Sequence, residues 1–123
     1  MKLPLAEVQA LVAAELRRAG ASAAMADSTA RALVLAESQG LGSHGLSRVA
    51  QYSTHLRNGR VDGAAVPQVL RRHGGALVVD AAEGLAFPAC DLAVAEALAA
   101  VTAQGVVMAG VVRRACAASS LHR

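Results

Sequence analysis

The pattern of apolar residues changes after Gly63, and this change limits the folds that the chain can adopt. Before Gly63, apolar residues recur at helical spacing. After it, two short β-prone runs are followed by a longer apolar stretch and then by another β-prone run. We therefore predict the α/β class, with a helical segment over residues 1–63, the beginning of an α/β domain over residues 64–112, and a tail over residues 113–123.

Three helices are predicted in the first segment. The first runs from Leu5 to about Gly20, where the glycine and the two arginines before it are typical of a helix end. Ser22 can cap the start of a second helix, which ends just before the third. The third helix is predicted to begin near Ser43 and to end at residues 58–59.

A β-α-β unit is predicted after this helical segment. Residues 66–70 and 76–79 are β-prone runs that we predict to form a hairpin. His73 is predicted to lie in the turn between these two strands. Pro88 suits the first turn of the helix that follows. Residues 106–112 are then predicted to form a buried strand, so the unit has the order that often begins a cofactor domain.

Four polar residues lie on one face of the third predicted helix, namely Ser43, His44, Arg48 and Tyr52. Steps of four and eight residues rotate by only about 40° and 80° around a helix. Arginine can hold a carboxylate through two parallel hydrogen bonds, and histidine can give or take a proton near neutral pH. This set suits a small acid with a carbonyl or hydroxyl next to its carboxylate, while the tyrosine closes the pocket. In a simpler alternative, Ser43 only caps the helix and Arg48 is a solvated surface residue.

Composition and charge exclude several other classes of function. The net charge is +3, but the cations are scattered and only Tyr52 and Phe87 are aromatic, so we expect no nucleic-acid partner. Cys90 and Cys116 lack the spacing of metal ligands, and no metal site is predicted. The longest uncharged run, residues 97–112, is too short to span a bilayer, and the first residues lack a signal-peptide core. We therefore expect no membrane association and a cytoplasmic location.

Residues 36–48, with the sequence AESQGLGSHGLSR, begin a resemblance to a known family. Together with Tyr52 and the LRNG of residues 56–59, they resemble the malate/L-lactate dehydrogenase family. This is the non-Rossmann type, which includes ureidoglycolate dehydrogenases, sulfolactate dehydrogenases and cyclic-imine reductases. The likeness covers roughly residues 3–112 in family order, through PQV at residues 67–69, VD at 79–80, EGLAFP at 83–88 and QGVV at 104–107.

The resemblance implies an oxidoreductase that uses NAD or NADP to transfer hydride between a nicotinamide and C2 of a 2-hydroxy acid. The oxidised product of the 2-hydroxy acid is the 2-oxo acid, and imine-reducing members of the family act on a C=N bond instead. It also implies that His44 is catalytic and that Ser43, Arg48 and Tyr52 bind the substrate. Residues 64–112 would begin the NAD(P)-binding domain, whose cofactor-binding residues remain unidentified and are expected largely beyond Arg123. The full-length form is expected to be a homodimer.

Family members are more than twice as long as this chain, so we expect an N-terminal portion of a longer enzyme. After residues 110–111 the family carries a Ser-His-His segment with the leading candidate for the general acid. Here residues 113–123 instead have the sequence RRACAASSLHR. We therefore expect that the chain alone has no useful dehydrogenase activity. In the alternative interpretation, the chain is a catalytically inactive helical interaction module.

Overall fold

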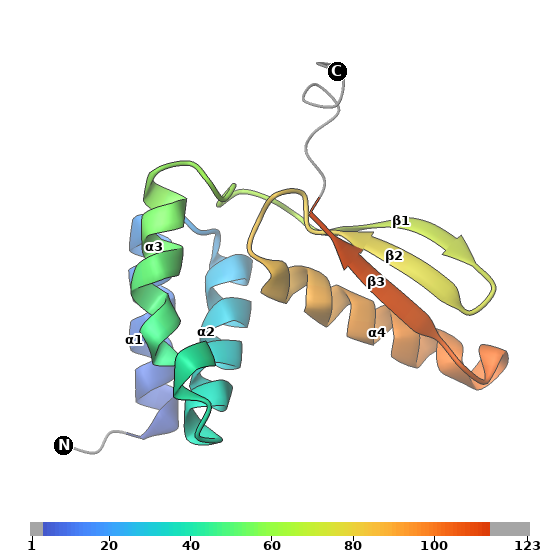
Figure 1. Cartoon of the computed structure of the whole chain (residues 1–123), viewed down its shortest axis with the longest axis horizontal. Helices are drawn as coiled ribbons and strands as arrows, with labels where there is room; N and C mark the ends of the chain where they lie inside the picture. The colour runs from blue at the N-terminus through green and yellow to red at the C-terminus, as the bar shows by residue number, and fades with distance from the viewer. Residues whose placement is uncertain (1–3, 114–123) are drawn as a thin grey trace. The chain divides into compact units, whose positions relative to one another are not determined.

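The computed structural model describes residues 4–113, which divide after Ala64 into two units (Figure 1). The predicted tail, including Cys116, lies outside the described residues apart from Arg113. The first unit contains helices α1 (Leu5–Ala19) and α2 (Ala23–Ser38), which confirms the first two predicted helices.

The two helix boundaries follow from local chemistry. Gly20 ends α1 with a backbone φ of +124°, a conformation that residues other than glycine rarely adopt. The hydroxyl of Ser22 accepts a hydrogen bond from the Met25 N–H at 3.2 Å and so caps the start of α2. Both signals are contained in a few neighbouring residues, which is why the sequence pattern could predict them.

The prediction of the third helix is wrong over its first residues. The chain forms two short 3₁₀ turns, η1 (Gly42–His44) and η2 (Leu46–Arg48), before helix α3 (Val49–Arg57) begins. Gly45 separates the two turns with φ −107° and ψ −130°, values that no helix contains. Ser43 therefore lies inside η1 and does not cap a long helix.

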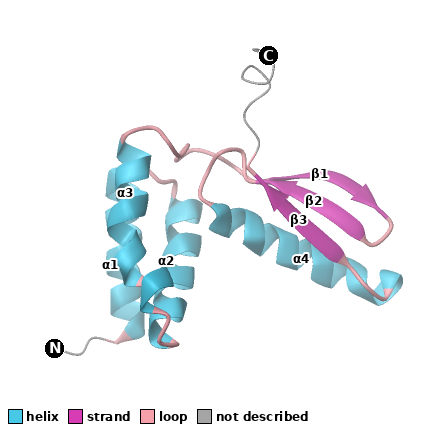
Figure 2. Ribbon diagram, in the orientation of Figure 1, coloured by secondary structure: helices cyan, strands magenta, loops and turns pink. Residues whose placement is uncertain are grey.

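The core of the first unit lies where α1 packs against α2 and α3 (Figure 2). Its largest fully buried apolar side chains are Leu16, Met25 and Leu33. At the surface, the Glu15 carboxylate of α1 accepts hydrogen bonds from Arg18 at 2.8 Å and from Arg57 of α3 at 3.2 Å. Because these ion pairs are exposed, the apolar contacts carry most of the stability of this unit.

Thr29 leaves an unsatisfied hydroxyl in this core. The residue is fully buried, and its Oγ1 has no hydrogen-bond partner among residues 4–113. Thr29→Val replaces the hydroxyl by a methyl group, so we expect the free energy of unfolding to rise by about 1 kcal/mol. Thermal unfolding followed by circular dichroism measures this effect, with Thr54→Val on the exposed surface of α3 as the control. A lower melting temperature for Thr29→Val would show that the hydroxyl has a partner after all.

The second unit contains a three-stranded sheet with a helix on one face. Strand β1 (Gln68–His73) pairs antiparallel with β2 (Ala76–Asp80), and β2 pairs parallel with β3 (Met108–Val112), which confirms the predicted hairpin and β-α-β unit. The turn of the hairpin is only Gly74-Gly75, because His73 still pairs with Ala76 in the sheet. The prediction of His73 as a turn residue is therefore wrong. Helix α4 (Ala86–Gln104) connects β2 to β3.

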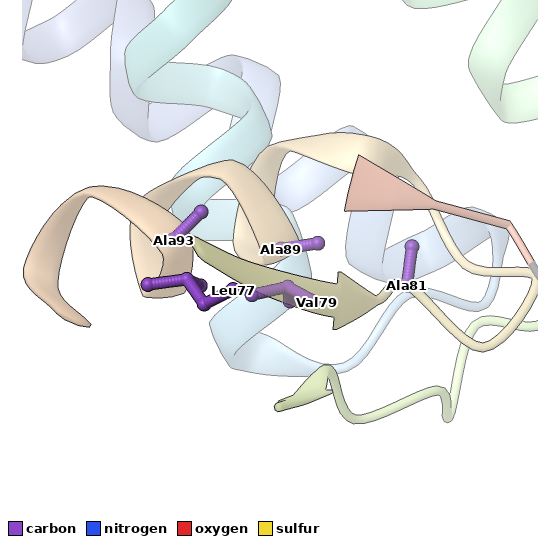
Figure 3. Packing of buried hydrophobic residues seen from close by; sticks show 5 residues of the cluster. All are labelled: Leu77, Val79, Ala81, Ala89 and Ala93. Carbon is purple, nitrogen blue, oxygen red and sulfur yellow. The ribbon is translucent and has the colours of Figure 1, made fainter. Parts of the chain in front are cut away.

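Alanines of α4 let the helix lie close to the sheet. Ala89 and Ala93 face Leu77 and Val79 of β2, and Ala81 extends the same cluster (Figure 3). All five residues are buried, and the small side chains bring the helix backbone close to the strand. The Arg72 guanidinium of β1 also pairs with the Glu96 carboxylate of α4.

The prediction that the last strand is buried is wrong. All five residues of β3 are exposed, and Met108 retains 75% of its accessible surface. The physical reason is position: β3 is an edge strand of the described sheet, with β2 on one side, and of its residues Ala109 and Val111 lie beside α4. A run of apolar residues predicts the strand but does not decide what lies against it.

Helix α4 is long and apolar enough to cross a bilayer if only length and composition are considered, with a mean hydropathy of 1.5. In the second unit it packs against β2 through Ala89 and Ala93. A core helix of a water-soluble protein meets the same two criteria, so they do not distinguish the two environments.

Candidate functional site

The residues predicted to form the site lie in and after the turn between α2 and α3. This turn is attached to α2 at two points. Leu41 N–H donates to the Ala36 carbonyl at 2.9 Å, and Leu46 N–H donates to Glu37 Oε1 at 3.0 Å. Within the turn, the Ser47 hydroxyl donates to the Gly42 carbonyl at 2.7 Å. These bonds give an exposed segment a defined backbone conformation.

Gly45 is buried against α2, and its size explains the break in the predicted helix. A Cβ at this position would lie 2.6 Å from Glu37 Oε1 and 3.0 Å from the Glu37 Cα. A side chain at position 45 would therefore require the Glu37 carboxylate to move away and the turn to shift from α2. Glycine therefore allows the turn to approach α2 so closely that Leu46 reaches the Glu37 carboxylate.

The Arg48 side chain folds back over the turn. Its Nε donates to the Ser43 carbonyl at 2.8 Å, and Nη1 donates to Gln51 Oε1 at 2.7 Å. These two bonds use two of the five N–H donors of a guanidinium. They hold the planar group in one orientation, so it can present its remaining donors to an anion such as a carboxylate.

The structure places the four predicted residues differently from a single helix face. Ser43 and His44 are exposed in η1, whereas Arg48 is half-buried at the end of η2 and Tyr52 is half-buried in α3. Arg48 is brought to the Ser43-His44 segment by its own side chain and not by helical spacing. The arrangement combines a fixed cation with an accessible imidazole, which can bind an acid and exchange a proton with it.

Sequence reasoning missed the structural role of Glu37. This residue belongs to the stretch at residues 36–48 that resembles the family, and the sequence pattern indicates no role for it there. The only available signal was its position near the end of the second predicted helix, where the helix dipole disfavours a carboxylate. That signal does not identify Leu46 as the partner, because the contact depends on the reversal of the chain at residues 40–45.

The loop from β2 to α4 does not fit the pyrophosphate of a nicotinamide dinucleotide. The loop from β2 to α4 is the natural place for a pyrophosphate, since it precedes a helix. Asp80 Oδ1 in this loop accepts the Ala82 N–H at 2.7 Å, and the exposed Glu83 carboxylate lies two residues before the Leu85 cap of α4. Both carboxylates repel an anion there. This loop is therefore unfavourable for the pyrophosphate of NAD or NADP.

A metal centre was not predicted from the sequence. Within residues 4–113, no group of three or more His, Cys, Asp or Glu side chains could hold a metal ion. Cys90 is a free, exposed thiol of α4.

Comparison with known proteins gives a consistent result. The family model for malate/L-lactate dehydrogenase matches residues 3–119. The chain is 40% identical over 105 residues to the (2R)-3-sulfolactate dehydrogenase (NADP(+)) of Chromohalobacter salexigens, covering 85% of this chain and 31% of that protein. It is also 40% identical over 89 residues to the Delta(1)-pyrroline-2-carboxylate/Delta(1)-piperideine-2-carboxylate reductase of Pseudomonas putida, covering 72% of this chain and 26% of that protein.

A solved structure shows the same fold. The delta1-piperideine-2-carboxylate reductase from Pseudomonas syringae pvar. tomato superimposes with a TM-score of 0.84 and 29% sequence identity. The superposition covers 90% of this chain and 33% of that one. The α/β fold predicted from the sequence is therefore confirmed, and the chain spans about a third of the length of these relatives.

Proposed function

Because this chain belongs to the malate/L-lactate dehydrogenase family, we propose that it carries the substrate-binding turn of an NAD(P)-dependent oxidoreductase. The substrates named for its relatives are a 2-hydroxy acid and cyclic imino acids. In both, a carboxylate is attached to the carbon that gains or loses hydride. The proposed reaction is therefore reversible hydride transfer at the carbon next to a carboxylate, between a 2-hydroxy acid and its 2-oxo acid.

The observation that carries this proposal is the fixed guanidinium of Arg48 next to the turn that exposes His44. In the proposed mechanism, Arg48 binds the substrate carboxylate through two parallel N–H···O bonds. Ser43 and Tyr52 make further polar contacts with the substrate. Binding at Arg48 would place the oxygen on C2 toward the Ser43-His44 segment.

His44 is proposed to hydrogen-bond the oxygen on C2 or to support its proton transfer, for which the leading general-acid candidate of the family lies in the Ser-His-His segment. When the 2-oxo acid is reduced, the carbonyl oxygen gains a proton and C2 gains hydride. In the reverse direction, the 2-hydroxyl group loses its proton. Bound NAD or NADP would supply or accept the hydride. The choice of cofactor rests on the family and on the NADP(+) in the name of one relative, since the loop before α4 does not fit a pyrophosphate.

The experiment that tests this proposal is a titration of the isotope-labelled 123-residue chain with pyruvate, followed by NMR. We expect pyruvate to shift the signals of His44 and Arg48. Propionate has the same charge but lacks the C2 oxygen, so we expect it to bind more weakly. Absence of pyruvate binding, or equal binding of propionate, would contradict the proposed substrate class.

We further propose that the 123-residue chain binds the acid without turning it over. It spans about a third of its relatives, and its loop from β2 to α4 does not fit the cofactor's pyrophosphate. Steady oxidation of NADH or NADPH by the purified chain with pyruvate or oxaloacetate would contradict this second proposal while supporting the first. A homodimeric full-length form and a cytoplasmic location stay predictions, as does the absence of nucleic-acid and membrane partners.

The alternative function, an interaction module, is favoured by one observation. Val94 and Leu98 of α4 expose 58% and 68% of their surfaces, and they line one shallow hollow with Val101 and Val107. Exposed apolar groups that lie together can mark a surface that another polypeptide covers. Light scattering of the purified chain separates the two possibilities: a monodisperse oligomer that does not bind pyruvate would favour the module.

A further inference from the structure

A carboxylate of α2 holds the turn that carries His44. We propose that Glu37 is a positioning residue, which fixes the conformation of this turn through Leu46 and Gly45 without touching the substrate. This inference rests on the proposed function, because it concerns the orientation of His44. It adds to that function a residue from a different helix.

The position of Glu37 within α2 is unfavourable for the helix itself. It is the second-last residue of α2, where the negative end of the helix dipole repels a carboxylate. The carboxylate gains its stabilisation outside the helix, from the Leu46 N–H at 3.0 Å. Leu46 is the first residue of η2, and the first N–H groups of a helical turn have no partner within it. Glu37 therefore acts as a side-chain cap for a turn nine residues further along.

Gly45 allows the turn to lie close to α2 beside this hydrogen bond. The Glu37 Cα and Cβ would both lie 3.0 Å from a Cβ at position 45, so the turn presses against the α2 backbone as well as the carboxylate. The carboxylate holds Leu46 from one side, and the helix surface limits the movement of Gly45 from the other.

His44 lies between two anchored points. On one side, the Ser43 carbonyl accepts the Arg48 Nε–H at 2.8 Å; on the other, Leu46 N–H is held by Glu37. Loss of the second anchor lets the turn sample other conformations. The apparent affinity for a ligand then falls in proportion to the fraction of molecules that retain the competent turn.

Amide hydrogen exchange of Leu46 in the 123-residue chain tests the proposal directly. Glu37→Ala removes the acceptor, and we expect exchange at Leu46 to become about tenfold faster. Glu37→Gln keeps an acceptor oxygen at the same place, so it is expected to restore most of the protection. Asp27→Ala is the matched control, because it removes an exposed carboxylate from the same helix away from the turn.

Pyruvate affinity supplies the second readout. We expect a severalfold higher dissociation constant for Glu37→Ala, a smaller change for Glu37→Gln, and melting temperatures close to that of Asp27→Ala. Unchanged Leu46 exchange in Glu37→Ala, or no rescue by Glu37→Gln, would overturn the positioning role. If the unmodified chain does not bind pyruvate, the proposed function fails, while Leu46 exchange and the His44 ring signals still decide whether Glu37 holds the turn.

Discussion

Arg48→Lys is expected to raise the dissociation constant for pyruvate by at least about tenfold in the 123-residue chain. Lysine keeps the positive charge but has no planar pair of donors, so it cannot hold a carboxylate through two parallel hydrogen bonds. It also lacks the Nε–H that Arg48 donates to the Ser43 carbonyl and the Nη1–H donated to Gln51. The substitution therefore removes both the ligand contact and the bonds that orient it.

The measurement is the same NMR titration with pyruvate, with circular dichroism to verify that the variant folds. Arg60→Lys is the matched control, because Arg60 is an exposed arginine of the same unit. We expect its affinity for pyruvate to equal that of the unmodified chain. If Arg48→Lys binds pyruvate as well as Arg60→Lys does, Arg48 is not the carboxylate anchor and the proposed site loses its central residue.

Gly63→Ala is expected to destabilise the first unit by about 3 kcal/mol. A Cβ at position 63 would overlap the Gly20 carbonyl oxygen and lie 2.8 Å from the Gly20 carbonyl carbon. Both are backbone atoms at the end of α1, and they cannot move without disturbing the bond from Ser22 N–H to the Gly63 carbonyl, which measures 2.8 Å. The cost therefore arises from overpacking of two backbone segments and not from a change in backbone conformation.

Thermal unfolding of the 123-residue chain measures this cost, and we expect the melting temperature of the first unit to fall by more than about 10 °C. Gly42→Ala is the control: Gly42 also has no positive φ, and a Cβ there would have only an ordinary contact of 4.0 Å with Glu37 Oε2. A melting temperature for Gly63→Ala within about 2 °C of the control would show that the two segments are not closely packed.

The helices and the β-α-β order could be predicted because their signals are local. Gly20 and Ser22 decide where α1 ends and α2 begins through their own backbone and side-chain chemistry. The glycine pair at residues 74–75 likewise makes the hairpin turn, although His73 remains in the strand. Each of these features depends on residues only a few positions apart.

The candidate site could be predicted in its residues but not in its geometry. The helical spacing that predicts the site does not exist in residues 43–48. The roles of its four residues stay predictions: Ser43, His44, Arg48 and Tyr52. Helical periodicity cannot reveal the break, because its cause is a contact between Gly45 and Glu37 on the preceding helix. Arg48 reaches the Ser43 carbonyl through its flexible side chain, which no spacing rule describes.

The order of residues was thus sufficient for the fold class, the family and most of the elements, because these follow from short-range propensity and from motifs in register. The three-dimensional packing alone decided the shape of the His44 turn, the role of Glu37 and the exposure of β3. In the first two cases, the stabilising energy comes from groups that the chain reversal brings together. In the third case, β3 is exposed because an edge strand has a neighbouring strand on one side only. Such contacts exist only after folding, since an extended chain holds the same residues too far apart to interact.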